Sequence, residues 1–238
     1  RSVVSNALRF QPIYEPLDPG QSDAVYSELN NGKLLSNPYT LATLVEDQKE
    51  AIAFHTRLAA VANVANHIKL SAKGAVNYKK NYRNNYFPTN TTRGRRNNGE
   101  ATQSFRQNMK FYTETKLQYK NKINDHRINA ILLGTYEFNK YRNLYNKAYG
   151  FGSDLTSYYT FESATDVLVP QANFSERSLL SGLIRGQYNY KDKYYINANA
   201  RIDASSKFAE NRKSGFFPSV GVSWRPSREP FLKDVEAI

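Results

Sequence analysis

The chain has 238 residues and a formal net charge of +12, because 33 lysine and arginine residues outnumber 21 aspartate and glutamate residues. This length is enough to bury a core, and it fits one all-β domain or two smaller domains. The basic excess makes nucleic acid, anionic lipid and acidic ligands the first partners to consider, with a solvated basic surface as the alternative. The chain has no cysteine, which excludes a disulfide framework and a thiolate zinc site.

Two kinds of membrane-related segment are missing from the sequence. No apolar run approaches the roughly 18 residues that a transmembrane helix needs, so any membrane-spanning structure must consist of strands. The first residues, RSVVSNALRF, lack the regions of a signal peptide, and we interpret the chain as an excerpt of a longer protein. No metal site is expected, because the histidines His55, His67 and His126 lack the spacing of paired ligands.

The composition indicates an all-β fold, because tyrosine, phenylalanine and threonine favour strands while asparagine and glycine favour turns. Alternation of apolar and polar side chains predicts about seven antiparallel strands. In chain order they lie at about residues 52–62, 68–78, 110–120, 126–141, 177–190, 193–207 and 218–225. The segment 57–70 also has an alanine content that favours a helix, but we interpret it as two strands around a turn at 63–67.

The clearest alternation lies in the segment 193–207. One of its faces would carry the apolar residues Tyr194, Ile196, Ala198, Ala200, Ile202 and Ala204. The other would carry the polar residues Asn197, Asn199, Arg201, Asp203 and Ser205. The last strand alternates in the same way, with Val220, Val222 and Trp224 opposite Ser219, Gly221, Ser223 and Arg225. Such strands are expected where one face of a sheet meets an apolar environment and the other meets water.

The connections between the predicted strands are of two lengths. Short ones lie at 63–67, 121–125 and 191–193, and long ones at 1–49, 88–103 and 146–175. Short turns on one side and long loops on the other are typical of outer-membrane barrels, whose long loops lie outside the cell. Aromatic residues gather near the short turns, as at a lipid interface, although ordinary cross-strand pairing of rings is the alternative. They are Tyr188, Tyr190, Tyr194, Tyr195 and Trp224.

The run INANARIDASSKFAENRKSGFFPSVGVSWRPSREPFLKD resembles the late-barrel signature of the SusC/RagA family, the TonB-linked outer-membrane transporters of Bacteroidota. The matching residues are Arg201, Asp203, Ser205, Ser206, Lys207, Phe208, Gly215, Phe216, Phe217, Pro218, Ser219, Trp224, Arg225, Ser227, Glu229, Phe231 and Leu232. Ala204 and Ala209 replace glycines of that signature, and Ser214 replaces a frequent tryptophan. The segment NPYTLAT, residues 37–43, is similar to another family motif.

The resemblance implies part of a transmembrane barrel of 22 strands, which in the family encloses an N-terminal plug. About seven strands cannot close such a barrel, and open sheet edges are not tolerated in lipid, so the chain would be the middle of a transporter. We expect a long extracellular loop region at 1–49 and part of the barrel at 50–238. In the last strand, Val220, Val222 and Trp224 would face lipid, and the segment 225–231 would form a periplasmic turn.

The polar face of these strands would line a positively charged lumen. The expected lumen cations are Lys69, Lys73, Lys116, Arg185 and Arg201. The carboxylates that would balance part of this charge are Glu114, Glu137 and Asp203.

The resemblance also implies the function, which is energy-coupled import of an oligosaccharide or a peptide. A SusD-like surface lipoprotein would cover the extracellular mouth, and TonB would act through the plug, which this chain lacks. The barrel would perform no bond chemistry and need no cofactor, so the chain is not expected to be an enzyme. The expected location is the outer membrane of a Gram-negative bacterium of the Bacteroidota, where a dimer of transporter–lid pairs is one possible arrangement.

Two groups of loop residues are candidates for binding. Tyr158, Tyr159 and Phe161 could stack on sugar rings or contact the lid, and the alternative is that they pack the loop on itself. The basic cluster Arg93, Arg95 and Arg96 could bind lipopolysaccharide phosphates through bidentate contacts, and the alternative is a solvated loop.

A soluble basic β-protein that binds nucleic acid through lysine, arginine and tyrosine is the alternative function. The strict apolar face of successive strands and the sorting of loops by length count against it, so no nucleic-acid partner is expected. An enzyme is less consistent still, because the sequence has no nucleophile elbow, P-loop, dinucleotide-binding motif or metal constellation.

Overall fold

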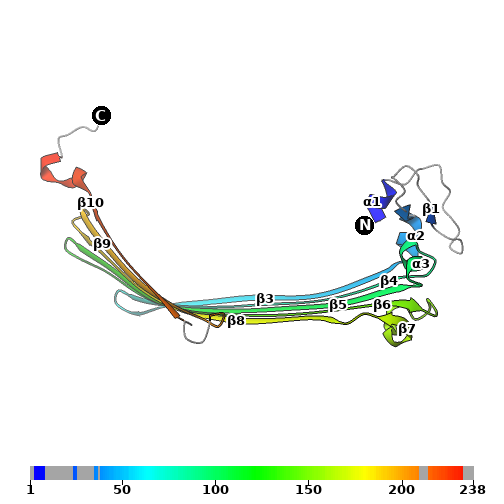
Figure 1. Cartoon of the computed structure of the whole chain (residues 1–238). Helices are drawn as coiled ribbons and strands as arrows, with labels where there is room; N and C mark the ends of the chain where they lie inside the picture. The colour runs from blue at the N-terminus through cyan, green and yellow to red at the C-terminus, as the bar shows by residue number, and fades with distance from the viewer. Residues whose placement is uncertain (1–2, 9–23, 26–34, 37, 209–213, 233–238) are drawn as a thin grey trace. The chain divides into compact units, whose positions relative to one another are not determined.

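The computed structural model describes residues 3–8, 24–25, 35–36, 38–208 and 214–232. Its long strands are β3 (Glu46–Ala65), β4 (Ile68–Phe87), β5 (Glu100–Ile123), β6 (His126–Phe151), β8 (Gln171–Tyr190), β9 (Tyr194–Ser205) and β10 (Ser214–Trp224). They form one sheet in the order β10-β9-β8-β6-β5-β4-β3, in which the short β7 (Ala164–Val167) pairs with β6 (Figure 1). The predicted all-β fold and each of the predicted strands are confirmed, whereas β7 was not predicted.

The other described elements are short. The helices are α1 (Val3–Ala7), α2 (Pro38–Thr43), α3 (Thr92–Arg96) and the 3-10 turns η2 (Ser157–Tyr159), η3 (Phe161–Ser163), η5 (Pro226–Arg228) and η6 (Pro230–Leu232). A separate pair of strands, β1 (Ala24–Val25) and β2 (Leu35–Ser36), lies in the region predicted as a loop. No helix in the described ranges is both long enough and apolar enough to cross a membrane. Asn37 and Ala209, which the family motifs include, lie outside the described residues.

The chain divides into two compact units, and each long strand from β3 to β6 contributes to both. The first unit comprises the described residues of Arg1–Ile52, Lys79–Gln107 and Tyr141–Phe174. The second comprises those of Ala53–Tyr78, Asn108–Lys140 and Ser175–Ile238.

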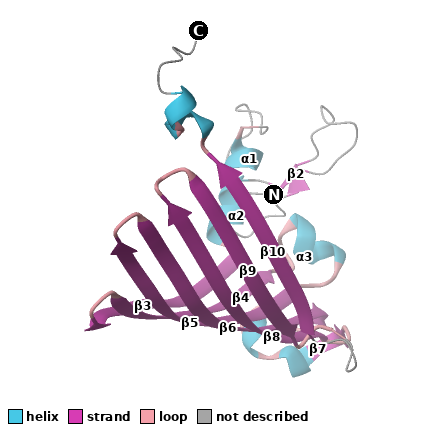
Figure 2. Ribbon diagram, turned by 90° about the vertical axis from the view of Figure 1, so that its left-hand side faces the viewer, coloured by secondary structure: helices cyan, strands magenta, loops and turns pink. Residues whose placement is uncertain are grey.

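The short turns of the second unit join neighbouring strands, and they all lie at the same end of those strands (Figure 2). β3 continues to Ala65 and β4 begins at Ile68, so the helical alternative for 57–70 is wrong. His67 has a φ of 66°, and Lys191 and Asp192 in the β8–β9 turn have φ values of 54° and 56°. Positive φ at both central positions is the geometry of hairpin turns whose twist suits the strands on either side.

The second unit has one polar and one apolar face, as the alternation predicts. Side chains on the polar face are joined by hydrogen bonds from β3 to β10, through His55–Asn77, Lys73–Glu114, Gln118–Asn129, Asn129–Gln187, Arg185–Asn199 and Asn199–Ser219. The apolar face is uncovered, since Val220 and Val222 are 77% and 78% exposed. Water would penalise such a face, so this sheet requires an apolar environment on one side only.

Most strands are longer than the sequence predicts. β4 continues from residue 78 to Phe87, β5 begins at Glu100 instead of 110, and β6 continues from 141 to Phe151. The predicted loops at 88–103 and 146–175 are therefore wrong in extent. In these extensions apolar and polar side chains no longer alternate regularly, as in KKNYRNN, while backbone pairing continues.

The segment after β10 is fastened to the start of β9 by Glu229. Its carboxylate accepts hydrogen bonds from Lys193 Nζ at 2.9 Å, Tyr194 Oη at 2.7 Å and Trp224 Nε1 at 3.2 Å. The backbone N–H of Arg225 also donates to the Lys193 carbonyl at 2.8 Å. The hydrogen bond from Lys193, followed by those from Tyr194 and Trp224, lowers the pKa of Glu229 to about 2.

This arrangement predicts a pH-dependent turn. The ordinary pKa of a glutamate is about 4.3, so the stabilisation from Glu229 should be complete above that pH and lost as the pH falls toward 2. Hydrogen exchange of residues 225–229 in the full-length protein in detergent, corrected for the intrinsic exchange rate, measures this. At pH 7, Glu229→Gln should exchange faster than the parent, and Asp125→Asn should not, because Asp125 reaches only Lys191 Nζ at 3.9 Å. Equal exchange in Glu229→Gln and the parent would contradict the role of this carboxylate.

Candidate functional site

A pocket of about 990 Å³ lies in the first unit, with walls from β3, β4, β5, β6 and α3. Its cationic lining residues are Lys49, Lys79, Arg83, Arg93 and Arg106. Among the described lining residues, Asp47 is the only carboxylate. The pocket therefore has a marked excess of positive charge, which attracts anions.

Two of these arginines are paired with carboxylates. Arg83 donates from Nε and Nη2 to the two carboxylate oxygens of Asp47 at 2.8 and 2.7 Å. Arg93 pairs with Glu100, which is 2% exposed and also pairs with Lys147 Nζ at 2.9 Å. The guanidinium carbon of Arg93 lies 4.1 Å from the centre of the Phe87 ring. These bidentate and stacked contacts hold both arginines in fixed positions on the pocket wall.

The helix that carries the predicted basic cluster is held close to the end of β4. Thr91 caps α3, because its Oγ1 accepts a hydrogen bond from the Gly94 N–H at 3.0 Å. Gly94 approaches the preceding backbone so closely that a Cβ there would lie 1.9 Å from the Pro88 carbonyl oxygen. Of the predicted lipopolysaccharide contacts, Arg93 lines the pocket, whereas Arg95 and Arg96 lie exposed on the surface of α3. Contact with lipopolysaccharide stays a prediction.

The predicted aromatic residues differ in exposure. Tyr158 is 4% exposed and belongs to a small core with Tyr86, Ala101, Ala148 and Phe151, against which Phe161 packs. The Tyr158 hydroxyl donates to Gln48 Oε1 at 2.5 Å, and its ring centre lies 4.5 Å from that of Tyr159. The hydrogen bond with Tyr159, together with burial, raises the pKa of Tyr158 to about 12, so the hydroxyl stays protonated. Tyr159 is 72% exposed.

Asp154 anchors the loop that carries these aromatic residues. Its carboxylate accepts hydrogen bonds from the Tyr86 hydroxyl at 2.7 Å and from the Thr89 N–H and Oγ1 at 3.0 and 2.6 Å. The loop after β6 is thus tied to the loop after β4. Tyr159 is therefore presented from a well-held backbone, as a binding residue should be.

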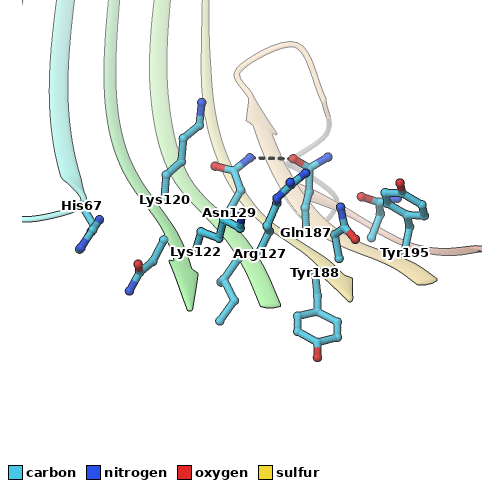
Figure 3. A pocket seen from close by; sticks show the side chains of 12 residues that line it. His67, Lys120, Lys122, Arg127, Asn129, Gln187, Tyr188 and Tyr195 are labelled. Carbon is cyan, nitrogen blue, oxygen red and sulfur yellow. Dashed lines mark hydrogen bonds between the residues drawn. The ribbon is translucent and has the colours of Figure 1, made fainter. Parts of the chain in front are cut away.

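A second pocket, of about 620 Å³, lies in the second unit near the short turns (Figure 3). Lys120, Lys122 and Arg127 contribute to its lining. In Figure 3 the Asn129 side chain points toward Gln187, and its Nδ2 donates to Gln187 Oε1 at 2.7 Å. This pocket is also basic, and it lies beside the hydrogen-bonded polar face of the second unit.

Several expected lumen residues do share that polar face. Arg185 donates to Asn199 at 2.7 Å, Arg201 to Asp203 at 2.9 Å, and Lys73 pairs with Glu114 at 2.9 Å. Sequence reasoning missed Lys49, Lys79 and Arg106, because they lie just beyond the predicted strand ends. A continued two-residue period from each strand would have found them.

Metal-binding side chains do not gather in the described ranges, which contain no group of three or more histidine, aspartate or glutamate residues placed to hold an ion.

Comparisons with known proteins agree with this geometry. Residues 3–231 match the family described as "TonB dependent receptor-like, beta-barrel". The chain is 30% identical over 238 residues to TonB-dependent receptor P3 of Formosa agariphila, which covers 99% of this chain and 23% of that protein. It is 31% identical over 109 residues to TonB-dependent receptor SusC of Bacteroides thetaiotaomicron, which covers 45% of this chain and 10% of that protein.

A solved structure described as "Structure of the RagAB peptide transporter" has the same fold. It is 20% identical to this chain and superposes with a TM-score of 0.72, covering 88% of this chain and 23% of that one. The chain thus spans 23% or less of the length of these three relatives.

Proposed function

The chain belongs to the TonB-dependent receptor β-barrel family, and we propose that it forms part of the wall of an outer-membrane importer. The resemblance to the SusC/RagA family that the sequence predicted is confirmed. Relatives in Formosa and Bacteroides support an origin in a Gram-negative bacterium of the Bacteroidota.

One observation carries the proposal, which is the sheet of the second unit with an exposed apolar face and a hydrogen-bonded polar face. On the apolar face, Ile184 and Leu58 are 61% and 71% exposed, and the valines of β10 are exposed to a similar degree. In an outer-membrane barrel such residues contact lipid, while the polar face lines the lumen. A nucleic-acid-binding β-protein would leave the same apolar face in water, and this argues against that alternative.

The remaining parts of the importer are proposed from the family. A plug within the complete barrel would receive the pull of TonB, and a SusD-like lipoprotein would cover the extracellular mouth. The substrate would be an oligosaccharide or a peptide, and the barrel would move it without bond chemistry. Lipid would surround the barrel, and two transporter–lid pairs would assemble as a dimer.

The long connections would lie on the extracellular side, together with the region 1–49. Tyr159 is the best candidate for contact with substrate or lid, because it is exposed on an anchored loop whereas Tyr158 is buried. Phe161 would support that loop by packing against its core. Arg95 and Arg96 are the candidates for lipopolysaccharide phosphates, because both are exposed on α3 and neither lines the pocket.

The lipid-facing assignment predicts opposite effects at neighbouring positions of β10. Val222→Arg should destabilise the protein by about 1–2 kcal/mol, between the values for the bilayer midplane and the interface, because a cation that faces lipid has no partner. Ser223→Arg, one residue later on the opposite face, should be near neutral. Urea unfolding of the full-length protein in lipid vesicles measures both variants. A larger loss in Ser223→Arg would reverse the assignment of the faces.

Deletion of the whole gene in its native bacterium tests the transport function. Growth and uptake are compared on neutral oligosaccharides, acidic oligosaccharides and peptides, each as sole carbon source. We expect loss of uptake for at least one of them, an equal loss when TonB is removed, and co-purification of a surface lipoprotein with the tagged transporter from the outer membrane. Unchanged uptake of all three classes would overturn the proposed function.

A further inference from the structure

The cationic pocket of the first unit contains more positive charge than the protein itself neutralises. Arg83 is balanced by Asp47, and Arg93 by the buried Glu100, which also pairs with Lys147. Lys49, Lys79 and Arg106 form no ion pair with any carboxylate in the described ranges. Arg106 Nε donates to the neutral side-chain oxygen of Asn143 at 3.2 Å, so its charge is held in place without being cancelled.

Three such cations around one pocket favour an anionic ligand. Confinement of like charges in a concave site raises the local concentration of anions. Arg106 offers a fork that fits a planar carboxylate or a sulfate, while the two lysines act as mobile point charges. The pocket of about 990 Å³ is large enough for several linked rings and not only for a single ion.

The neutral polar residues of the lining fit a sugar better than an extended peptide. Asn81, Asn85, Thr102 and Ser104 can each donate and accept hydrogen bonds, as sugar hydroxyls also do. Peptides recognised in extended form pair their backbone with a free strand edge. Here β4 and β5 are interior strands whose edges are occupied by their neighbours. β3 ends the sheet in this chain and would pair with the adjacent strand of the complete barrel, so we expect no free strand edge in the pocket wall.

We propose that this pocket binds the carboxylate or sulfate groups of an acidic oligosaccharide, with Lys49, Lys79 and Arg106 as the anion-binding residues. The proposal rests on the importer function and gives that function a substrate class. An acidic oligosaccharide would enter the pocket with its negative groups directed to β3, β4 and β5. Asp47 limits the positive charge by engaging Arg83.

Binding to the purified full-length transporter with its lid tests the proposal. The probes are hexagalacturonate, a chondroitin sulfate hexasaccharide, neutral maltohexaose and the peptide hexaglutamate, measured by calorimetry at two salt concentrations. We expect at least one acidic oligosaccharide to bind, more weakly at high salt, and maltohexaose not to bind. Preferential binding of maltohexaose, preferential binding of hexaglutamate, or binding of neither acidic oligosaccharide would each overturn the proposal.

Variants assign the binding to these residues. The triple variant Lys49→Gln, Lys79→Gln, Arg106→Gln should weaken binding of the acidic probe about a thousandfold, since each of the three charged hydrogen bonds contributes roughly a factor of ten. The charge-retaining variant Lys49→Arg, Lys79→Arg, Arg106→Lys should keep most of the affinity. Lys80→Gln is the matched control, because Lys80 follows Lys79 in β4 but does not line the pocket. Unchanged affinity in the triple variant would overturn the assignment.

A variant that should strengthen binding distinguishes an effect on the pocket from a loss of folding, because misfolding could only weaken binding. Asp47→Asn removes the single carboxylate of the described lining and frees Arg83, so the acidic probe should bind more tightly. Weaker binding would count against the proposal. Failure of the importer function itself is recognised separately, because deletion of the gene would then leave the uptake of every tested class unchanged.

Discussion

The sheet and its two faces depend on the pairing of strand backbones, because pairing fixes which side chains share a face. Once neighbouring strands are hydrogen-bonded, successive residues must point to opposite sides of the sheet. The chain uses one side for valine, leucine and isoleucine, and the other for lysine, arginine, asparagine and glutamate. Neither side closes a core of its own in the second unit, so in the proposed barrel its stability would depend on lipid on one side and a wet lumen on the other.

The first unit meets a different requirement, because its strand ends do not carry a continuous apolar face and bury a core of their own. There the ends of β4, β5 and β6 form a small core with Tyr158, in which Tyr86 and Phe151 are buried, and Asp154 joins two loops. The pocket of the first unit can therefore be lined by charged residues, because its strands do not need them for a core. The unpaired cations of the pocket are tolerated since they lie in a water-accessible site, where isolated charges are not penalised as they would be in lipid.

The sequence predicted strands in the segments where apolar and polar side chains alternate, because the two faces of the sheet meet different environments. The segment from Ile196 to Ile202 of β9 is an example. It did not identify Lys79 and Arg106 as site residues, because they lie just beyond the predicted ends of their strands, where the alternation of apolar and polar side chains fades. The burial of Tyr158 was equally invisible, since it depends on Gln48, which lies 110 residues away, and on core residues such as Tyr86 and Ala101 from β4 and β5. The family signature, by contrast, was readable because its motif residues lie within one short stretch.

The contacts of Glu229 have a consequence for strand alignment. Trp224 and Tyr194 lie opposite each other where β10 pairs with β9, and both donate to the same carboxylate. A slip of β10 by one residue would turn Val220 and Val222 to the polar side and move Trp224 away from that carboxylate. Glu229 therefore fixes the register of β10 against β9. Although this side chain lies outside the sheet, it favours the alignment that keeps the valines of β10 on the apolar face.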